Sequence, residues 1–162
     1  FVLFASWDRK DNYYGLAWFL ENVIEKLNDK LQFKIIGGGL SIDNIDYEKY
    51  KNVEYLGFVE NPYEIISNAK ALIAPIFSGA GVKIKVIEAL ACGTPVIGTD
   101  IAIEGIDKMF SPFMIKAQKD IDFVNRINEI NFSIKERQDF KQKVISYYED
   151  SKVIDFIKTN NI

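Results

Sequence analysis

"ALIAPIFSGAGVKIKVIEALACGTPVIGT", residues 71–99, joins two apolar runs through a glycine-containing loop and an apolar stretch of helical length. The runs "ALIAPI" and "PVIGT" have the length and composition of buried strands. The helix between them is predicted to end at Gly93, and Pro95 opens the second strand. This order of strand, helix and strand is typical of a right-handed crossover in a parallel sheet.

The same alternation extends along the whole chain. Further strands are predicted in "FVLFAS", "FKIIGGG", "VEYLGF" and "FMIKA", and further helices in "GLAWFLENVIEKLND", "PYEIISNAK", "DIDFVNRINEI", "SIKERQDFKQKVISYYED" and "KVIDFIKTNN". Apolar strands without a polar face fit a parallel sheet that is covered on both sides. The sequence therefore predicts an α/β fold, a Rossmann-like three-layer α/β/α domain with a parallel sheet of about six strands.

Composition narrows the classes of function. The 162 residues are 48% hydrophobic and 27% charged, which suits one globular domain, and the net charge of -3 argues against a nucleic-acid partner. The chain has no histidine, so Ser-His-Asp and Cys-His sites and histidine-ligated zinc are excluded. The single cysteine, Cys92, predicts a buried helix residue in a reducing, cytoplasmic compartment. The chain lacks an apolar run of membrane-spanning length and starts at Phe1 inside a strand-like segment, so we expect one domain of a longer protein.

Ligands of parallel sheets bind beyond the carboxyl ends of the strands. The loops predicted there are "SWDRKDN", "GGGLS", "GFVEN" and "FSGAGVK". In the last of these, Gly79 and Gly81 precede a helix, where free backbone amides, the positive helix end and two lysines favour an anion such as phosphate. The alternative is a tight turn with two solvated lysines, Lys83 and Lys85.

Glu88 lies in the middle of the apolar helix. The only other polar side chains between Val82 and Cys92 are those of Lys83 and Lys85, so the helix is predicted to be largely buried. A buried carboxylate needs a partner. Lys85, three residues earlier, is one candidate, and a ligand with vicinal hydroxyls, such as a ribose, is the other.

The segment "APIFSGAGVKIKVIEALACGTPVIGTDIAIEGI" resembles the donor-binding, C-terminal half of retaining "group 1" glycosyltransferases with the GT-B architecture. The blocks "FVLFASWDRKDNYYGLAWFL", "FKIIGGG" and "VEYLGFVENPYEIISNAKALIAPI" support the resemblance, which covers most of the chain. It implies that residues 1–162 form the nucleotide-sugar domain and that an N-terminal acceptor domain lies outside this chain.

The family resemblance also implies roles for individual residues. The glutamate matching Glu88 accepts hydrogen bonds from the ribose, which favours the ligand as its partner. The other implied binding residues are Gly79, Ala80, Gly81, Val82 and Lys83 at the diphosphate and sugar, Gly57, Phe58 and Val59 against the base, and Gly37, Gly38 and Gly39 where the nucleotide approaches closely.

The sequence departs from the family pattern in two places. Many members hold the transferred hexose with a second glutamate, whose position here is Ala80. Many also carry an arginine and a lysine after the first strand for the phosphates, where this chain offers Ser6 and Asn12, with Arg9 and Lys10 nearby.

Two lysines of the glycine loop are predicted to compensate. Lys83 and Lys85 would stabilise the negative charge that grows on a diphosphate leaving group, and they are the predicted catalytic residues. They point about 200 degrees apart on a helix, and Lys85 is preferred because it shares a stripe with Glu88.

Two short motifs have simpler explanations. "DID" at Asp120 to Asp122 matches a metal-binding string, but carboxylates also suit the first turn of a helix. "GGGLSI" begins like a dinucleotide fingerprint, but Ile42 stands where the third glycine belongs.

The resemblance implies an enzyme: transfer of a hexose from a nucleoside diphosphate sugar, with UDP favoured, to a glycan or lipid-linked acceptor in polysaccharide biosynthesis. Retention of configuration, no metal or other cofactor, and no transfer by the isolated domain are expected. The full-length enzyme would reach the inner face of the membrane through its N-terminal domain. The alternative is a non-catalytic, nucleotide-responsive module of flavodoxin or receiver type, for which Asp8 and Asp11 would be the acidic residues after the first strand.

Overall fold

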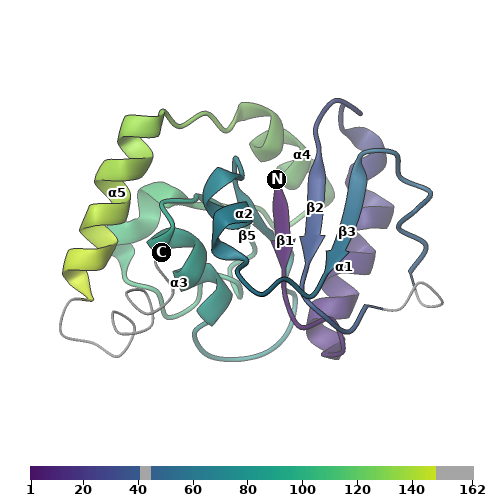
Figure 1. Ribbon diagram of the computed structural model, residues 1–162, viewed down its shortest axis with the longest axis horizontal. Coiled ribbons are helices and arrows are strands. Elements are labelled where there is room, and N and C mark those ends of the chain that lie inside the picture. Colours follow the sequence, from purple (N-terminus) through teal and green to yellow (C-terminus); the bar gives the residue numbers. More distant parts are fainter. Residues whose placement is uncertain (41–44, 149–162) are drawn as a thin grey trace.

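All six predicted strands form one parallel sheet in the computed structural model, which describes residues 1–40 and 45–148 (Figure 1). The strand order is β3-β2-β1-β4-β5-β6. The strands are β1 (Val2–Phe4), β2 (Phe33–Ile36), β3 (Val53–Gly57), β4 (Leu72–Ala74), β5 (Val96–Gly98) and β6 (Met114–Lys116). The predicted α/β class and parallel sheet are confirmed.

The helices follow the predicted pattern with local differences. They are α1 (Lys10–Asn22), α2 (Tyr63–Asn68), α3 (Ile84–Ala91), α4 (Asp120–Glu129) and α5 (Ile134–Tyr147), with two 3-10 helices, η1 (Ile24–Lys26) and η2 (Lys108–Phe113). The first helix starts five residues earlier than the predicted Gly15 and gives way to η1, and η2 was not predicted. The helix predicted at 152–161 lies outside the described residues.

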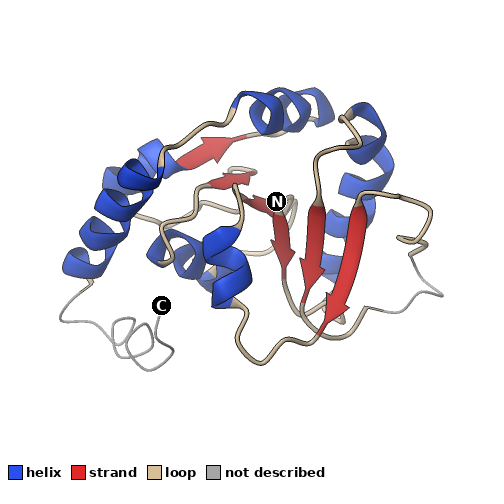
Figure 2. Ribbon diagram, turned by 45° about the horizontal axis from the view of Figure 1, so that its top comes forward, coloured by secondary structure: helices blue, strands red, loops and turns tan. Residues whose placement is uncertain are grey.

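Two hydrophobic cores lie on opposite faces of the sheet, since successive strand residues point to opposite sides. Val2 belongs to the core beneath α2, α3 and α5, whereas its neighbour Leu3 belongs to the core beneath α1 and α4. Leu72 and Ile73 divide in the same way. The view in Figure 2 shows helices on both sides of the strands, as expected for three layers.

The chain changes direction across the sheet at β1. After β1 it adds β2 and β3 on one side, and it then returns to add β4, β5 and β6 on the other. β1 meets β4 through the pair Val2 and Leu72. The loops that follow these two strands therefore leave in opposite directions, which opens a crevice at their carboxyl ends.

Gly15 allows α1 to lie close to the loop after β4. A Cβ atom at Gly15 would be 2.0 Å from the carbonyl oxygen of Pro75. This contact holds the first turns of α1 beside the β4 loop, on the side of the sheet where the crevice opens.

Arg137 of α5 joins the ends of α2 and α3 on the opposite face. Its guanidinium donates to the carbonyl oxygens of Gly93 at 2.9 Å and Ser67 at 2.6 Å, and to the hydroxyl of Thr94 at 3.0 Å. Gly93 has a φ of 74°, which confirms its predicted place just after the helix. α3, which carries the predicted functional residues, is thus fixed at its C-terminal end.

Several smaller predictions are confirmed. Cys92 is buried at the end of α3. At the start of α5, Ser133 and Glu136 form a capping box. Asp120 and Asp122 open α4, where Asp122 accepts hydrogen bonds from the backbone amides of Gln118 and Lys119.

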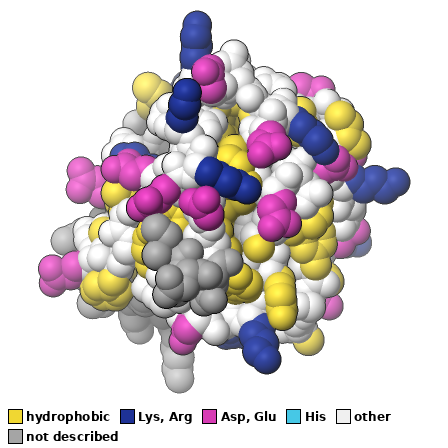
Figure 3. Space-filling view, turned by 90° about the vertical axis from the view of Figure 1, so that its right-hand side faces the viewer, with side chains coloured by type: hydrophobic (Ala, Val, Ile, Leu, Met, Phe, Trp, Pro, Cys, Tyr) yellow, Lys and Arg dark blue, Asp and Glu magenta, His cyan; other side chains and the backbone are white. Residues whose placement is uncertain are grey.

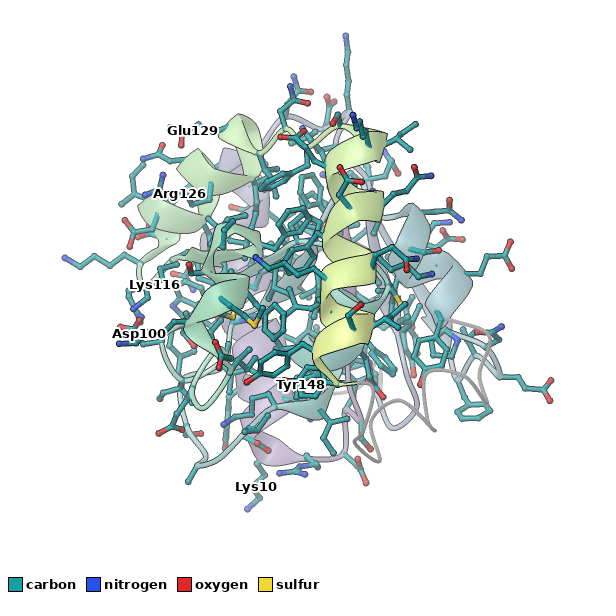
Figure 4. The ribbon with its side chains drawn as sticks, turned by 90° about the vertical axis from the view of Figure 1, so that its left-hand side faces the viewer. Lys10, Asp100, Lys116, Arg126, Glu129 and Tyr148 are labelled. Atoms are coloured by element: carbon teal, nitrogen blue, oxygen red, sulfur yellow. The ribbon has the colours of Figure 1, made fainter. Side chains whose placement is uncertain are left out.

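The surface mixes charges of both signs. Figure 3 shows basic and acidic side chains interspersed over one face. At the β6 side, Asp100 and Lys116 form an exposed ion pair at 2.7 Å, and Arg126 pairs with Glu129 at 3.2 Å on α4 (Figure 4). Within residues 1–40 and 45–148, every helix is too short or too polar to span a bilayer.

Substituting Gly15→Ala should destabilise the protein by about 1–3 kcal/mol, because the new methyl group would displace the Pro75 carbonyl or the helix. An exposed change on the same helix, Glu21→Ala, should stay within about 0.5 kcal/mol of the parent. Urea unfolding of both variants measures the difference. A Gly15→Ala variant that gains stability would show that α1 need not lie this close to the β4 loop.

Candidate functional site

A cleft of about 560 Å³ lies at the carboxyl ends of the strands, where the loops after β1 and β4 diverge. Its walls come from the β1 loop and α1, the β2 and β3 loops, and the glycine loop with α3. The lining residues are Phe4, Ala5, Ser6, Arg9, Asp11, Asn12, Gly37, Gly38, Phe58, Ile76, Gly79, Ala80, Val82, Lys83, Ile84, Lys85 and Glu88.

Glu88 of α3 reaches this cleft as a half-buried carboxylate. The Tyr63 hydroxyl of α2 donates to Glu88 Oε1 at 3.3 Å. Burial raises the pKa of Glu88 above its ordinary value, while the Tyr63 hydrogen bond and the charge of Lys85 act to lower it. The pKa of Tyr63 is raised, first by its own burial and then by the Glu88 charge.

The predicted burial of α3 is correct only for one side of the helix. Val86, Ala89 and Leu90 are buried, but Ile84 in the first turn is 70% exposed. The helix begins at the rim of the cleft, so Ile84 at its first position faces outward, whereas Val86, two residues later, already packs in the core. Glu88 therefore has access to the cleft from a half-buried position.

Lys85 lies one turn before Glu88 and contacts α1 across the cleft. Its Nζ donates to Asn12 Oδ1 at 2.6 Å, so the candidate pairing of Lys85 with Glu88 is replaced by Asn12 for the lysine and Tyr63 for the glutamate. Burial lowers the pKa of Lys85 to about 8. The Asp11 carboxylate counteracts this shift, whereas Arg9 and Lys83 add to it.

Lys83 has a different local role. Its Nζ donates to the carbonyl oxygen of Gly81 at 2.5 Å, within the same loop. Lys83 also immediately precedes α3, as its N-cap residue. The two lysines therefore differ: Lys83 contacts its own loop, and Lys85 is partly buried and faces α1.

Asp11 adds a second carboxylate to the cleft. Its side chain is 24% exposed and its Oδ2 lies 3.4 Å from Arg9. The same oxygen would be 3.6 Å from a Cβ atom at Gly79, so this acidic group lies beside the glycine loop. Glu88 and Asp11 thus both act on Lys85, from α3 and from α1 respectively.

The β2 and β3 loops form the other wall. Phe58, which follows β3, is 82% exposed and faces the cleft opening. Gly37 approaches the β1 loop so closely that a Cβ atom there would be 1.8 Å from the Ala5 carbonyl oxygen. Gly39 packs against the backbone of Asp8 instead of lining the cleft.

Most predicted site residues converge in this cleft. Those that line it are Lys83, Lys85, Glu88, Gly79, Ala80, Val82, Gly37, Gly38, Phe58, Ser6 and Asn12; those that do not are Gly81, Gly39, Gly57 and Val59. Gly57 is the last residue of β3, and the partly buried side chain of Val59 packs against the core beneath α2, α3 and α5. Gly39 and Gly81 belong to the β2 loop and the glycine loop.

Sequence reasoning missed the Tyr63 contact and the position of Asp11. Tyr63 follows Pro62 at the start of α2, and its contact with Glu88 depends on how α2 packs against α3. Asp11 looks like an ordinary first-turn acid of α1. Only the closeness of α1 to the β4 loop, which Gly15 permits, could have indicated that Asp11 enters the cleft.

Within the described ranges there is no group of three or more acidic or cysteine side chains that could hold a metal ion. The Asp8 carboxylate already has a partner in its own loop, because its Oδ1 accepts a hydrogen bond from the Ser6 hydroxyl at 2.6 Å. The Ile42 position of the "GGGLSI" motif lies outside the described residues.

Comparison with known proteins gives a consistent result. A family described as "Glycosyl transferases group 1" matches residues 1–131. No curated protein matches the sequence.

Three solved structures illustrate the shared fold. A mutant of TarM from S. aureus, in complex with fondaparinux, alpha-GlcNAc-glycerol and UDP, has a TM-score of 0.66 at 19% identity over 98% of this chain and 34% of its own. HepE from Anabaena, in complex with UDP, has a TM-score of 0.66 at 13% identity, over 90% of this chain and 44% of its own. WaaG, a glycosyltransferase involved in lipopolysaccharide biosynthesis, has a TM-score of 0.63 at 15% identity, over 94% of this chain and 43% of its own. The chain spans about a third to a half of the length of these proteins.

Tyr63→Phe should raise the pKa of Glu88 further, since it removes a hydrogen bond that stabilises the ionised carboxylate. Carbon NMR titration of the Glu88 carboxyl group measures this shift. Tyr14→Phe, at an exposed tyrosine of α1, should leave the titration unchanged. An unaltered Glu88 titration in Tyr63→Phe would show that the hydroxyl does not support the carboxylate.

Proposed function

This chain belongs to the group 1 glycosyltransferases, and from that premise we propose that it binds the nucleotide-sugar donor in a retaining hexosyltransferase. The enzyme would move a hexose from a UDP-sugar to a glycan or lipid-linked acceptor, in polysaccharide biosynthesis. UDP is supported by two compared structures, since the TarM mutant and HepE are both complexes with UDP.

The observation that carries this proposal is the order of groups along the cleft. Glu88 and Lys85 are one helical turn apart, and the glycine loop begins just before them. A carboxylate accepts hydrogen bonds from the two hydroxyls of a ribose, and an ammonium with free backbone amides attracts a diphosphate. A nucleoside diphosphate placed this way has its base toward Phe58 and its terminal phosphate toward Gly79.

Lys85 suits the leaving-group end of the reaction. Its ammonium is partly buried, and the ion pairs among the described residues do not include it. When the bond from the sugar to the diphosphate breaks, the electron pair stays on the phosphate oxygen, and a preplaced cation stabilises that charge. The acceptor hydroxyl would be the nucleophile, and no metal ion or other cofactor is part of the proposal.

A second domain would close the cleft. Exposed apolar side chains surround its opening, among them Phe58, Ile84 and Val82, and Tyr14 on α1 is also exposed. Apolar groups around a polar cleft favour a contact with another protein surface. We assign that surface to an N-terminal acceptor domain, so that residues 1–162 alone would transfer no sugar, and that domain would bring the enzyme to the inner face of the membrane.

The alternative, a receiver-like module without catalysis, is not favoured. Its acidic residues would be Asp8 and Asp11, but Asp8 accepts from Ser6 and Asp11 is paired with Arg9. The family match also points away from it.

Glu88→Gln should weaken UDP binding by about 1.5–3 kcal/mol, the range for hydrogen bonds to a charged group, or roughly ten- to a hundredfold. Binding of 2′,3′-dideoxy-UDP should change little, because that ligand lacks the hydroxyls. Titration calorimetry compares both ligands, with Glu64→Gln on the exposed side of α2 as the matched control. Equal losses for both ligands would reject the ribose role of Glu88.

The affinity for UDP should fall as the pH rises above about 8, because Lys85 loses its proton there and only the charged form attracts the diphosphate. Uridine, with the same base and no phosphate, should lack this dependence. Lys85→Met should bind UDP about tenfold or more weakly near pH 7 and lose the pH dependence. A profile that is the same in Lys85→Met and the parent protein would assign the titration to another group.

A further inference from the structure

Asn12 uses both ends of its amide group within the cleft. Its Nδ2 donates to the carbonyl oxygen of Ser6 at 2.9 Å, and its Oδ1 accepts from Lys85 Nζ at 2.6 Å. Ser6 follows β1, and Lys85 lies on α3 after β4. One side chain of α1 therefore connects the two loops between which the crevice opens.

The position of Asn12 is set by the backbone around it. Gly15, one turn later on α1, keeps the helix beside Pro75 of the β4 loop. The Ser6 hydroxyl bonds to Asp8, so it is the Ser6 carbonyl that orients the Asn12 amide. With the nitrogen end fixed on Ser6, the oxygen end is aimed at the lysine.

We propose that Asn12 is a positioning residue that holds the Lys85 ammonium in the cleft with a neutral acceptor and leaves its positive charge available to an anionic ligand. This inference rests on the proposed function where it takes that ligand to be a diphosphate. Asn12 then acts through Lys85, and it is not itself the group that contacts the phosphates.

The charges around Lys85 explain why the acceptor is neutral. Asp11 on α1 and Glu88 on α3 favour the ammonium, while Arg9 and Lys83 disfavour it. Ion pairs within the described residues engage Asp11 with Arg9 and do not include Lys85. A carboxylate at position 12, at the distance of the present amide oxygen, would form an ion pair with Lys85 and cancel its charge.

The hydrogen bonds of Asn12 to Ser6 and to Lys85, which we call the Asn12 bridge, lead to a test with two substitutions. The two should shift the pKa of Lys85 in opposite directions, and both should lower the affinity for UDP. Asn12→Asp keeps the shape but adds a charge, so the pKa of Lys85 should rise. Asn12→Ala removes the acceptor of the charged form, so the pKa of Lys85 should fall. Both variants should bind UDP more weakly than the parent. The loss should be about tenfold or more near pH 7 for Asn12→Asp, and for Asn12→Ala it should grow as the pH rises.

NMR titration of the Lys85 side chain in the free protein measures the first effect, with Lys135, exposed on α5 and outside the cleft, as an internal reference. Titration calorimetry with UDP measures the second. Asn125→Asp makes the same substitution at an exposed position of α4 and should change neither quantity. A purely structural role of Asn12 would not shift the Lys85 pKa in opposite directions.

The inference is supported if the two pKa shifts are opposite and both variants bind UDP more weakly. It is overturned if the Lys85 titration is unchanged in both variants, or if Asn12→Asp binds UDP as tightly as the parent. A parent protein that fails to bind UDP would instead reject the nucleotide function, and the Lys85 titrations would still decide whether the Asn12 bridge exists.

Discussion

The reversal of chain direction between β1 and β4 is the constraint on which the site depends. Two halves of the sheet meet there, through the pair Val2 and Leu72. Because the following loops turn away from each other, the backbone leaves a crevice that side chains only partly fill. The charged groups of the cleft, which are Arg9, Asp11, Lys83, Lys85 and Glu88, lie on the loops and helices that follow β1 and β4. The cleft would not exist in a sheet whose strands followed one another in sequence order.

The cleft alternates the signs of its charges. Glu88, Lys85 and Asp11 follow one another, and each is only partly exposed, so each charge acts in a medium less polar than water. Such an arrangement is costly unless each group has a partner. Tyr63, Asn12 and Arg9 supply partial compensation from neighbouring elements. The remaining imbalance is what a ligand with hydroxyls and phosphates would satisfy.

The fold could be predicted from the sequence because buried parallel strands have short, uniformly apolar sequences. All six strands and the five described α-helices lie within or overlap the predicted segments, and the glycine loop and Glu88 were placed at the correct end of the sheet.

The features that the sequence did not predict depend on contacts between segments that are distant in the chain. The Tyr63 partner of Glu88 is 25 residues away, and the Asn12 partner of Lys85 is 73 residues away. A local sequence pattern does not indicate contacts between residues so far apart in the chain. The exposed start of α3 was missed for the same reason, since its apolar Ile84 points to the rim.

The hydrogen bond between Asn12 and Lys85 also bears on the order of folding. It joins the first and second halves of the chain, so it needs α1 and α3 in their native positions relative to each other. Closing a loop of this length is entropically unfavourable and is compensated late, by contacts made in the finished structure. Ligand affinity would then report on global folding, and a molecule bound in the cleft would stabilise both halves of the sheet together by mass action.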